Sequence, residues 1–526
     1  MIDKIKKLSR WQYFICFFFL IIFLIGIFTF KDYGIADDER IERNHDLVTH
    51  YYIQSLLNGK KIADGNPTWN VKTNPLEKLV EKEKIERRFY IYRYRYYGVA
   101  IQMPTVLVEQ AFNYNLDISH IYQIRHMYNF LIFFISLIYF YKLLKNFLIK
   151  DEKLSFVATL FLILSPRIYG DAFYNIKDLV FMSLFIINIY YSFKYLDKSS
   201  FKNFILLCLI SAVTINCRII GGIILLLTII FEIIKKKRKA IVNIIELVLI
   251  TYIIYILITP ASWINMLNYP IDVLNFFFNY SDPYSHKIQT CFYFNKTISS
   301  EKLPWHYLPV WIFITTPFIY ILLSIIGTFS EWLNFKIKKI NTKWLFCNII
   351  LILMLLTVIV FRPTLYTGWR HFYFIYPLII INAIYGLKYL LNVLKKYNKI
   401  ILIIVLINLI YIAGWMIKNH PYQYEYFQLG VRKYAISNFE TNYWMVSNSD
   451  AFKYLAKQTN KKIKVYADPK VGYYTLSKNE IKKIKLVKTK KEADYIIDNA
   501  KYKKKKYKEI TNKKIDGYRL YTIYKK

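Results

Sequence analysis

The sequence predicts a polytopic α-helical membrane protein with about eleven transmembrane helices and a small α/β domain at its C-terminal end. Hydrophobic residues make up 55% of the 526 residues, and the mean hydropathy is positive. These residues fall in long blocks instead of at amphipathic spacing, and Lys and Arg gather between the blocks. Because a helix needs roughly 20 apolar residues to cross about 30 Å of hydrocarbon, we interpret the repeated blocks as membrane spans.

The first block, residues 11–30, is apolar or small throughout except for Gln12 and Thr29. It follows a basic leader and lacks a small-residue cleavage site, so we expect a retained anchor and not a signal peptide. The predicted spans are residues 12–30, 127–147, 154–169, 178–195, 203–217, 218–234, 241–259, 307–328, 343–361, 371–391 and 399–417. The fifth and sixth of these meet at Arg218 with nothing between them.

Short loops rich in Lys and Arg usually face the cytoplasm, and this rule predicts the orientation of the chain. With eleven spans, six basic segments fall on one side: the N-terminus and residues 142–153, 194–202, 235–239, 336–343 and 395–399. We therefore expect a cytoplasmic N-terminus and an extracytoplasmic C-terminus in a cell membrane, specifically a bacterial inner membrane. If residues 203–234 formed one span, every later segment would invert.

Two domains are predicted. Residues 1–417 form the transmembrane domain, with a long first extracytoplasmic loop at 31–125, and residues 418–526 form a C-terminal extracytoplasmic domain. Strand-like runs at 463–467, 495–497 and 518–524, together with a capped helix that begins near Asp450, indicate a small α/β fold there. The basic character of this domain is compatible with its predicted side, because long segments translocate largely regardless of charge.

The net charge of +38 would also suit a nucleic-acid-binding protein. Here the basic residues lie mostly between spans and in the tail, so we attribute the charge to membrane orientation and a compositional bias, and we expect no nucleic-acid partner. The sequence has no Walker A loop, GxGxxG or HExxH motif, which argues against a nucleotide-driven pump. The five cysteines are scattered and predict neither a metal cluster nor a disulfide framework.

Three consecutive acids, Asp37, Asp38 and Glu39, follow the first predicted span. A carboxylate at this depth lies where a lipid-linked substrate presents its headgroup, and it could take a proton from an acceptor hydroxyl as a general base. The alternative is a helix N-terminus, since Asp favours the N-cap and Glu the first turn. Apolar residues follow at helical spacing from Ile41 to Leu56, which predicts a helix lying on the membrane surface.

The second outer loop, residues 165–177, combines cations and carboxylates between two spans. Arg167 and Lys177 could hold a phosphate, Arg167 through a bidentate fork. Asp171 and Asp178 are candidate substrate contacts. The alternative is a solvated turn whose basic side chains extend to the membrane surface, although a carboxylate at the start of a span, as at Asp178, weakens it.

Other candidates lie at the ends of predicted spans. Arg218 could hold a phosphate or act as an interface anchor. Arg370 and His371 open the tenth span among aromatic residues, for which a membrane-interface belt is the alternative. Trp305 and His306 precede the eighth span between prolines, which we expect to shape the entry of that helix.

Several segments repeat a known pattern in order and on one predicted face: residues 34–39, 165–178, 303–307, 368–371, 420–424 and 442–444. In these segments the chain resembles the membrane glycosyltransferases of family 39 and their bacterial relatives, in the GT-C fold class. Those enzymes include protein O-mannosyltransferases and the lipid A aminoarabinose transferase. The likeness covers residues 1 to about 460. The acidic pair of the family maps onto Asp38 and Glu39, with Asp37 as an extra acid where an aromatic is frequent.

The resemblance implies a GT-C-like fold and a hexosyl- or pentosyltransferase that inverts the anomeric centre. The donor would be a sugar on a polyprenyl phosphate, such as undecaprenyl or dolichyl phosphate, and the acceptor a hydroxyl on a protein, lipid or glycan. Asp38 would be the base and Glu39 would help to orient the acceptor. The leaving phosphate would be stabilised by Arg167, Lys177, Arg218 and Arg370. The other substrate-site candidates are Asp37, Asp171, Asp178, Trp305, His306 and His371. No cofactor is expected to be required, although some relatives bind a divalent metal.

A transporter or flippase of a lipid-linked sugar would explain the spans and the outer cations equally well. It predicts polar residues across the bilayer midplane, whereas the mid-span positions here are almost wholly Ile, Leu, Phe and Val. The protein could also be a sensor whose C-terminal tail binds a ligand, but that function would not explain why the first loop is long. We therefore favour glycosyl transfer.

Overall fold

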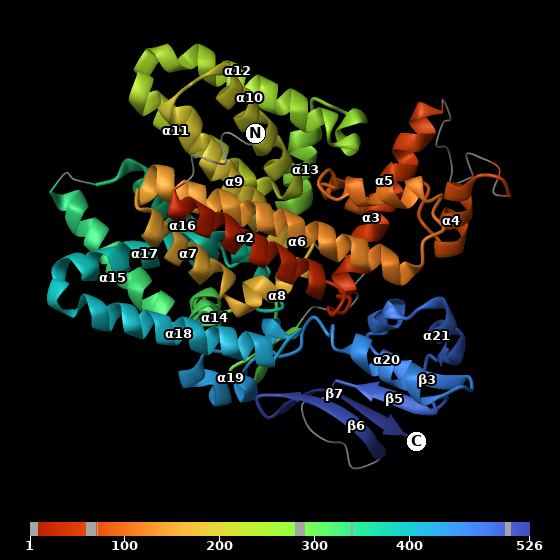
Figure 1. Ribbon diagram of the computed structural model, residues 1–526. Coiled ribbons are helices and arrows are strands. Elements are labelled where there is room, and N and C mark those ends of the chain that lie inside the picture. Colours follow the sequence, from red (N-terminus) through yellow and green to blue (C-terminus); the bar gives the residue numbers. More distant parts are fainter. Residues whose placement is uncertain (1–8, 59–69, 71, 279–289, 338–339, 500–506) are drawn as a thin grey trace.

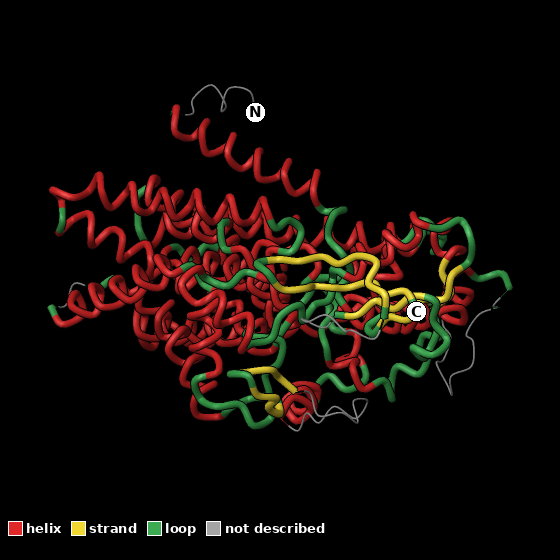
Figure 2. Tube along the Cα trace, turned by 90° about the horizontal axis from the view of Figure 1, so that it is seen from below, coloured by secondary structure: helices red, strands yellow, loops and turns green. Residues whose placement is uncertain are grey.

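The computed structural model describes residues 9–58, 70, 72–278, 290–337, 340–499 and 507–526. Long helices form a bundle that makes up most of it, and a small sheet domain lies at one end of this bundle (Figure 1). Figure 2 shows helix α2 (Arg10–Thr29) along one edge, set apart from the other helices. The N-terminal anchor predicted from the sequence is therefore a peripheral helix of the bundle.

The polytopic helical prediction is confirmed. The long apolar helices are α2, α6 (Ile118–Leu143), α7 (Glu152–Ile163), α9 (Asp178–Asp197), α10 (Phe201–Cys217), α11 (Gly222–Lys236), α12 (Ile241–Leu257), α15 (Phe318–Lys336), α16 (Thr342–Phe361), α17 (Tyr376–Val393) and α18 (Asn398–Lys418). By length and composition, eight helical stretches of the described residues could cross a membrane, or nine if a bent pair counts as one span. That tally joins α11 to α12 and leaves out α10, so the count of eleven stays a prediction.

Prolines interrupt two of the predicted spans. Helix α7 ends at Ile163, and Pro166 begins α8 (Pro166–Tyr174) at a bend of 65°. In the same way Pro317 separates α14 (Tyr307–Thr315) from α15. Proline has no N–H to donate and its ring clashes with the preceding turn, so it can begin a helix but not continue one. The expectation of a loop at 165–177 is therefore wrong over α8, all of whose residues are buried.

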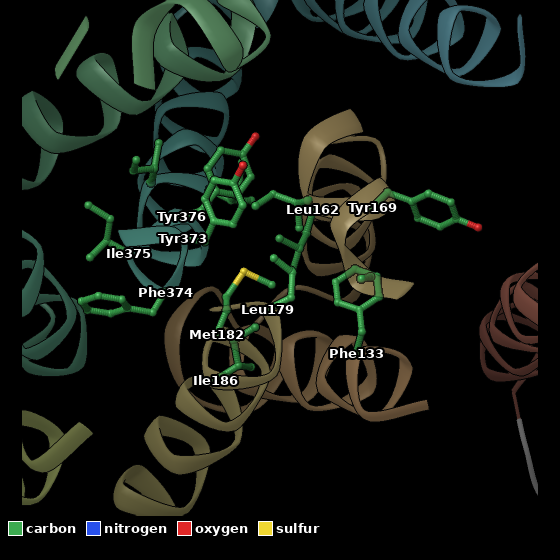
Figure 3. Packing of buried hydrophobic residues seen from close by; sticks show 14 of the residues in the cluster. Phe133, Leu162, Tyr169, Leu179, Met182, Ile186, Tyr373, Phe374, Ile375 and Tyr376 are labelled. Carbon is green, nitrogen blue, oxygen red and sulfur yellow. The ribbon is translucent and has the colours of Figure 1, made fainter. Parts of the chain in front are cut away.

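Helices α9 and α17 form the centre of the bundle. Of the 18 most apolar consecutive residues in Asp178–Asp197, 89% are buried inside the protein. The corresponding share is 78% in Arg370–Val393 and only 22% in α2. Figure 3 shows Leu179, Met182 and Ile186 of α9 in one packed cluster with Phe374, which belongs to η6 (Arg370–Ile375), the short helix that leads into α17. This packing fixes the start of α9 at Asp178 and the start of η6 at Arg370, so both charged residues are held in place.

The first loop folds into a helical cap with its own core. The helices of the first loop are α3 (Asp37–Leu57), α4 (Pro75–Glu83), η1 (Arg93–Tyr96) and α5 (Met103–Ala111). Helix α13 (Tyr269–Phe278), from a later part of the chain, packs into the same core. The predicted helix after the acidic residues is confirmed as α3. On it Tyr51 and Tyr52 are buried in the core of the cap, whereas Ile41 and Leu56 are exposed. Much of the apolar surface of α3 thus packs against protein.

The C-terminal domain is a mixed sheet with helices, as its strand and helix signals predict. Its order is β4-β3-β5-β7-β6, in which β3 pairs parallel with β4 and β5, and β7 pairs antiparallel with β5 and β6. The elements are α19 (Arg432–Asn438), α20 (Asn448–Gln458), β3 (Ile463–Ala467), α21 (Lys478–Lys483), β4 (Ile484–Leu486), β5 (Tyr495–Asp498), β6 (Lys508–Ile515) and β7 (Tyr518–Lys525). All three predicted strands are present as β3, β5 and β7.

Short elements complete the chain. They are η2 (Leu144–Leu148), η3 (Ile219–Gly221), η4 (Lys237–Ala240), η5 (Pro260–Trp263), β1 (Thr290–Tyr293), β2 (Lys296–Ser299), η6 (Arg370–Ile375), η7 (Lys395–Tyr397), η8 (Gln423–Glu425), η9 (Leu429–Val431) and η10 (Val471–Thr475). Strands β1 and β2 form an antiparallel hairpin, in which Cys291 pairs with Ile298.

The orientation in the membrane stays a prediction with a direct test. A reporter that is active only in the cytoplasm, fused after Lys526, is expected to be silent, because the six basic segments place the C-terminus outside. The measurement is reporter activity in intact cells, with the same reporter fused after residue 239 as the active control. An active C-terminal fusion would contradict the predicted topology of eleven spans.

Candidate active site

The three predicted acids separate at the start of α3. The carboxylate of Glu39 accepts a hydrogen bond from the Ala36 N–H at 2.8 Å and lies 2.9 Å from His126 Nε2, in a fully buried position. Burial raises the pKa of the Glu39 carboxyl, and His126 acts against this rise. Asp38 points the other way, with 43% of its side chain exposed. Glu39 thus caps α3 and contacts α6, whereas Asp37 and Asp38 stay accessible at the start of the helix.

Asp38 is one end of a line of alternating charges, here called the charged row, which consists of Asp38, Arg370, Asp178 and Arg218. Arg370 Nη1 donates to Asp38 Oδ2 at 2.5 Å and to Asp178 Oδ2 at 3.4 Å. Arg218 Nη2 donates to the other oxygen of Asp178. Asp178 and Arg370 are buried, so the alternation of sign is what allows these charges to lie there.

A second ion pair lies beside the charged row. Lys177, the neighbour of Asp178, places its Nζ 3.4 Å from Glu42 Oε2 and 3.1 Å from the carbonyl oxygen of Gly98. Glu42 follows Asp38 by one turn of α3, so the two carboxylates share a face. Burial acts to raise the pKa of Glu42, but Lys177 and His45 outweigh it and hold that pKa well below its usual range.

A cavity of about 180 Å³ lies against these cations. Lys177 and Arg218 line it, together with an aromatic wall made by Tyr96, Tyr97, Tyr255, Tyr269 and Phe277. A larger apolar groove of about 700 Å³ lies between α15 and α16, and no residue of the charged row lines it. Of these two cavities, only the smaller one is lined by both cationic and aromatic side chains, so it is the one that could hold a polar headgroup.

A buried ionic network holds α3 against the rest of the cap. Arg43 Nη2 lies 2.7 Å from Glu109 of α5, and its Nη1 lies 2.6 Å from Glu83 of α4. Arg125 of α6 lies 2.8 Å from Asp46 and 3.6 Å from Glu109. Because α3 carries two members of this network, the network also fixes the helix on which Asp38 lies.

Replacing Glu109 by Ala is expected to destabilise the protein by about 1–3 kcal/mol, because both arginines lose a buried contact although Glu83 and Asp46 still pair with them. The measurement is the free energy of unfolding, or the shift of the unfolding midpoint, of purified protein. Glu86→Ala is the matched control: its pair with Arg88, at 3.0 Å, is largely exposed, and its loss should cost less than about 1 kcal/mol. Equal effects of the two changes would contradict a structural role for the network.

Arg167 and Asp171 both lie on the buried helix α8. The guanidinium of Arg167 is buried between aromatic rings, 4.7 Å from the centroid of Phe427 and 5.5 Å from that of Trp311. Its Nε donates to the carbonyl oxygen of Tyr426 at 2.8 Å. The predicted phosphate contact of Arg167 is therefore not brought together with Lys177 or Arg218, and it stays a prediction.

The remaining candidates are divided between the site and its surroundings. His371 is adjacent to Arg370, and its ring meets the edge of Tyr366 with centroids 4.7 Å apart. His306 Nδ1 lies 2.6 Å from the hydroxyl of Tyr293 in β1, and Trp305 is exposed. Asp37 is also exposed. Among the described residues, no group of three or more His, Cys, Asp or Glu side chains could hold a metal ion.

Sequence reasoning missed two contributors to the site. Glu42 was detectable, because it follows Asp38 at a spacing of four on a predicted helix. Trp444, whose ring centroid lies 4.6 Å from the guanidinium of Arg370, was not assigned to the site because it follows the last span by many residues. Only the folded chain brings it to Arg370.

Comparison with known proteins gives one family match. A model of the dolichyl-phosphate-mannose-protein mannosyltransferases matches residues 117–263. The chain is similar to this family over the segment that carries Lys177, Asp178 and Arg218. No curated protein sequence matches the chain.

Two solved structures are also similar to the chain. One is the crystal structure of ArnT from Cupriavidus metallidurans bound to undecaprenyl phosphate, with 11% identity over 88% of this chain and 84% of that chain and a TM-score of 0.48. The other is the same protein in the apo state, with 11% identity over 90% of this chain and 86% of that chain and a TM-score of 0.41.

Proposed function

We propose that this protein is an integral membrane glycosyltransferase of the GT-C class, which moves a hexose or pentose from a polyprenyl phosphate to a hydroxyl acceptor at the outer face of the membrane. The charged row beside the cation-lined cavity carries the proposal. It places a half-exposed carboxylate next to cations at the ends of apolar helices. The match to the mannosyltransferase family over residues 117–263 supports this assignment.

Asp38 is the proposed general base. The acceptor oxygen attacks the anomeric carbon while the bond from that carbon to the phosphate oxygen breaks, and the acceptor proton passes to the Asp38 carboxylate. The electron pair of the broken bond leaves with the polyprenyl phosphate. In a single displacement of this kind the acceptor oxygen attacks the carbon from the side opposite the leaving phosphate, so the anomeric centre is inverted.

Lys177, Arg218 and Arg370 are the proposed phosphate contacts. Two of them line the cavity of about 180 Å³, where a phosphate would meet the cations and the lipid or sugar would meet the tyrosine wall. A phosphate that binds Lys177 and Arg218 and also reaches Arg370 would compete with Asp38, which lies 2.5 Å from Arg370 Nη1. Donor binding thereby frees the carboxylate to accept a proton.

A transfer assay tests the proposal. Purified protein in lipid nanodiscs is given undecaprenyl-phosphate mannose or dolichyl-phosphate mannose labelled in the sugar, with membranes of the source organism as acceptor. We expect label to appear in an acid-stable product and polyprenyl phosphate to be released. In vesicles, movement of labelled lipid between leaflets without any transfer would favour a flippase instead.

The reaction as proposed needs no metal ion, because three cationic side chains can offset the charge that develops on the leaving phosphate. We expect turnover to be unchanged after treatment with EDTA and removal of the chelator. A loss of turnover that added Mg²⁺ or Mn²⁺ restores would overturn this prediction and would call for a metal in the donor site.

A further inference from the structure

Trp444 belongs to the segment between the last apolar helix and the C-terminal sheet, yet it packs against the charged row. Its buried ring lies beside the guanidinium of Arg370, 4.6 Å from ring centroid to Cζ. The indole N–H donates to Asp171 Oδ2 at 3.1 Å. Arg370 is therefore held by the carboxylates of Asp38 and Asp178 and by the aromatic face of Trp444.

Asp171 connects this ring to the start of α9. It is fully buried and accepts hydrogen bonds from the indole of Trp444, from the hydroxyl of Tyr174 at 3.0 Å and from Asn175 Nδ2 at 3.2 Å. The side-chain oxygen of Asn175 in turn accepts from the N–H of Asp178 at 2.8 Å. The buried carboxylate of Asp171 thus fixes the position of the Trp444 indole directly and, through Asn175, that of the backbone at Asp178.

The C-terminal sheet holds the segment that carries Trp444. Asn442 Nδ2 donates to the carbonyl oxygen of Leu520 in β7 at 2.7 Å, and the Asn442 N–H donates to Glu425 Oε1 at 2.6 Å. The other oxygen of Glu425 accepts from the hydroxyl of Tyr518, also in β7. Asn442 has a φ of 53°, a left-handed conformation that Asn tolerates better than most residues. Strand β7 therefore holds the segment from which the side chain of Trp444 extends.

We infer that the C-terminal domain positions Arg370 for the reaction and that Trp444 is the positioning residue through which it acts. The inference rests on the proposed function. A guanidinium in a desolvated site is attracted to an aromatic face, and the indole N–H bond to Asp171 prevents the ring from turning away. Since the phosphate charge grows in the transition state, loosening Arg370 should lower kcat more than it raises KM.

The test combines two substitutions at Trp444 with a change at Arg370. Trp444→Ala is expected to lower kcat by about 10- to 100-fold with little change in KM, which is the scale of a displaced catalytic contact. Trp444→Phe keeps a ring under the guanidinium but loses the hydrogen bond to Asp171, so it should restore only part of the activity. Arg370→Gln should be strongly impaired, and the double variant with Trp444→Ala should be no worse than Arg370→Gln alone, because both changes remove one function.

Two more variants separate positioning from folding. Asn442→Gly removes the side-chain bond to Leu520 of β7, together with the bonds that Asn442 accepts from Tyr424 and Ser447, while glycine accepts the positive φ. It should therefore reproduce the kcat defect of Trp444→Ala if this segment positions Trp444. Tyr434→Ala, at an exposed tyrosine of α19 in the same region, should leave turnover unchanged.

Each outcome decides the inference. An active wild-type protein whose Trp444→Ala variant keeps its kcat would overturn the inference and leave the proposed function standing. A rise in KM alone, or a double variant far worse than Arg370→Gln, would also overturn it, because Trp444 would then act on the substrate or independently of Arg370. A wild-type protein that neither transfers sugar nor binds undecaprenyl phosphate would overturn the proposed function, and the inference with it.

Discussion

Replacing Asp38 by Asn is expected to lower sugar transfer by roughly 10²–10⁴-fold while the fold is preserved. Asn has nearly the same shape, and its amide oxygen can still accept the hydrogen bond from Arg370 Nη1, which also contacts Asp178. An amide cannot accept a proton near neutral pH, so the base is lost and the cations remain. The measurement is transfer from a polyprenyl-phosphate donor by purified protein, beside binding of undecaprenyl phosphate, which should survive.

Asp37→Asn is the internal control for this change. Asp37 is the exposed neighbour at the first position of α3, so its substitution should have a much milder effect on turnover. A fully active Asp38→Asn protein would refute the assignment of the base. A fully inactive Asp37→Asn protein with a normal fold would instead move the base by one residue.

The helical membrane architecture was predictable because apolar blocks long enough to span a bilayer are visible in any sequence that contains them. The C-terminal strands were predictable for the same kind of reason, since β3, β5 and β7 are runs of alternating or β-branched and aromatic residues. The break at Pro166 was harder to interpret. The sequence shows the proline, but only packing decides whether the chain after it is a loop or the buried helix α8.

The candidate site was predictable in part. The sequence places Asp38, Lys177, Asp178, Arg218 and Arg370 on one side of the membrane, and the structure brings them together. It does not indicate that Asp38 and Arg370, separated by 332 positions, form a pair. Such a pair depends on how the helices pack, and hydropathy carries no information about that.

Helix geometry explains why Glu39 does not share a face of α3 with Asp38. Successive residues of a helix point about 100° apart, so Asp38 and Glu39 cannot both face the substrate side of α3. Glu39 turns toward His126, and Glu42, one turn after Asp38, faces Lys177. Arg167 and Asp171 are inside for a different reason, because every residue of α8 is buried.

Replacing Arg218 by Gln is expected to lower kcat/KM for the lipid donor by about 10²–10³-fold, the typical effect of removing one donor that stabilises a developing oxyanion. Arg218 lines the cavity and is partly exposed, so a phosphate can reach it. Asp178 keeps its contact with Arg370 after the change, at 3.4 Å, so no buried carboxylate is left without a cation. The measurements are turnover against donor concentration and binding of undecaprenyl phosphate.

Arg519→Gln is the matched control, because Arg519 also donates to a carboxylate, Glu509 at 2.8 Å, but lies on the β6–β7 hairpin and does not line the cavity. It should leave kcat/KM unchanged. Arg218→Lys is informative as well: it keeps the charge but loses the planar fork, so it should recover part of the loss if the contact is to a phosphate. If Arg218→Gln binds and turns over the donor normally, Arg218 serves only to hold Asp178, and the phosphate contacts reduce to Lys177 and Arg370.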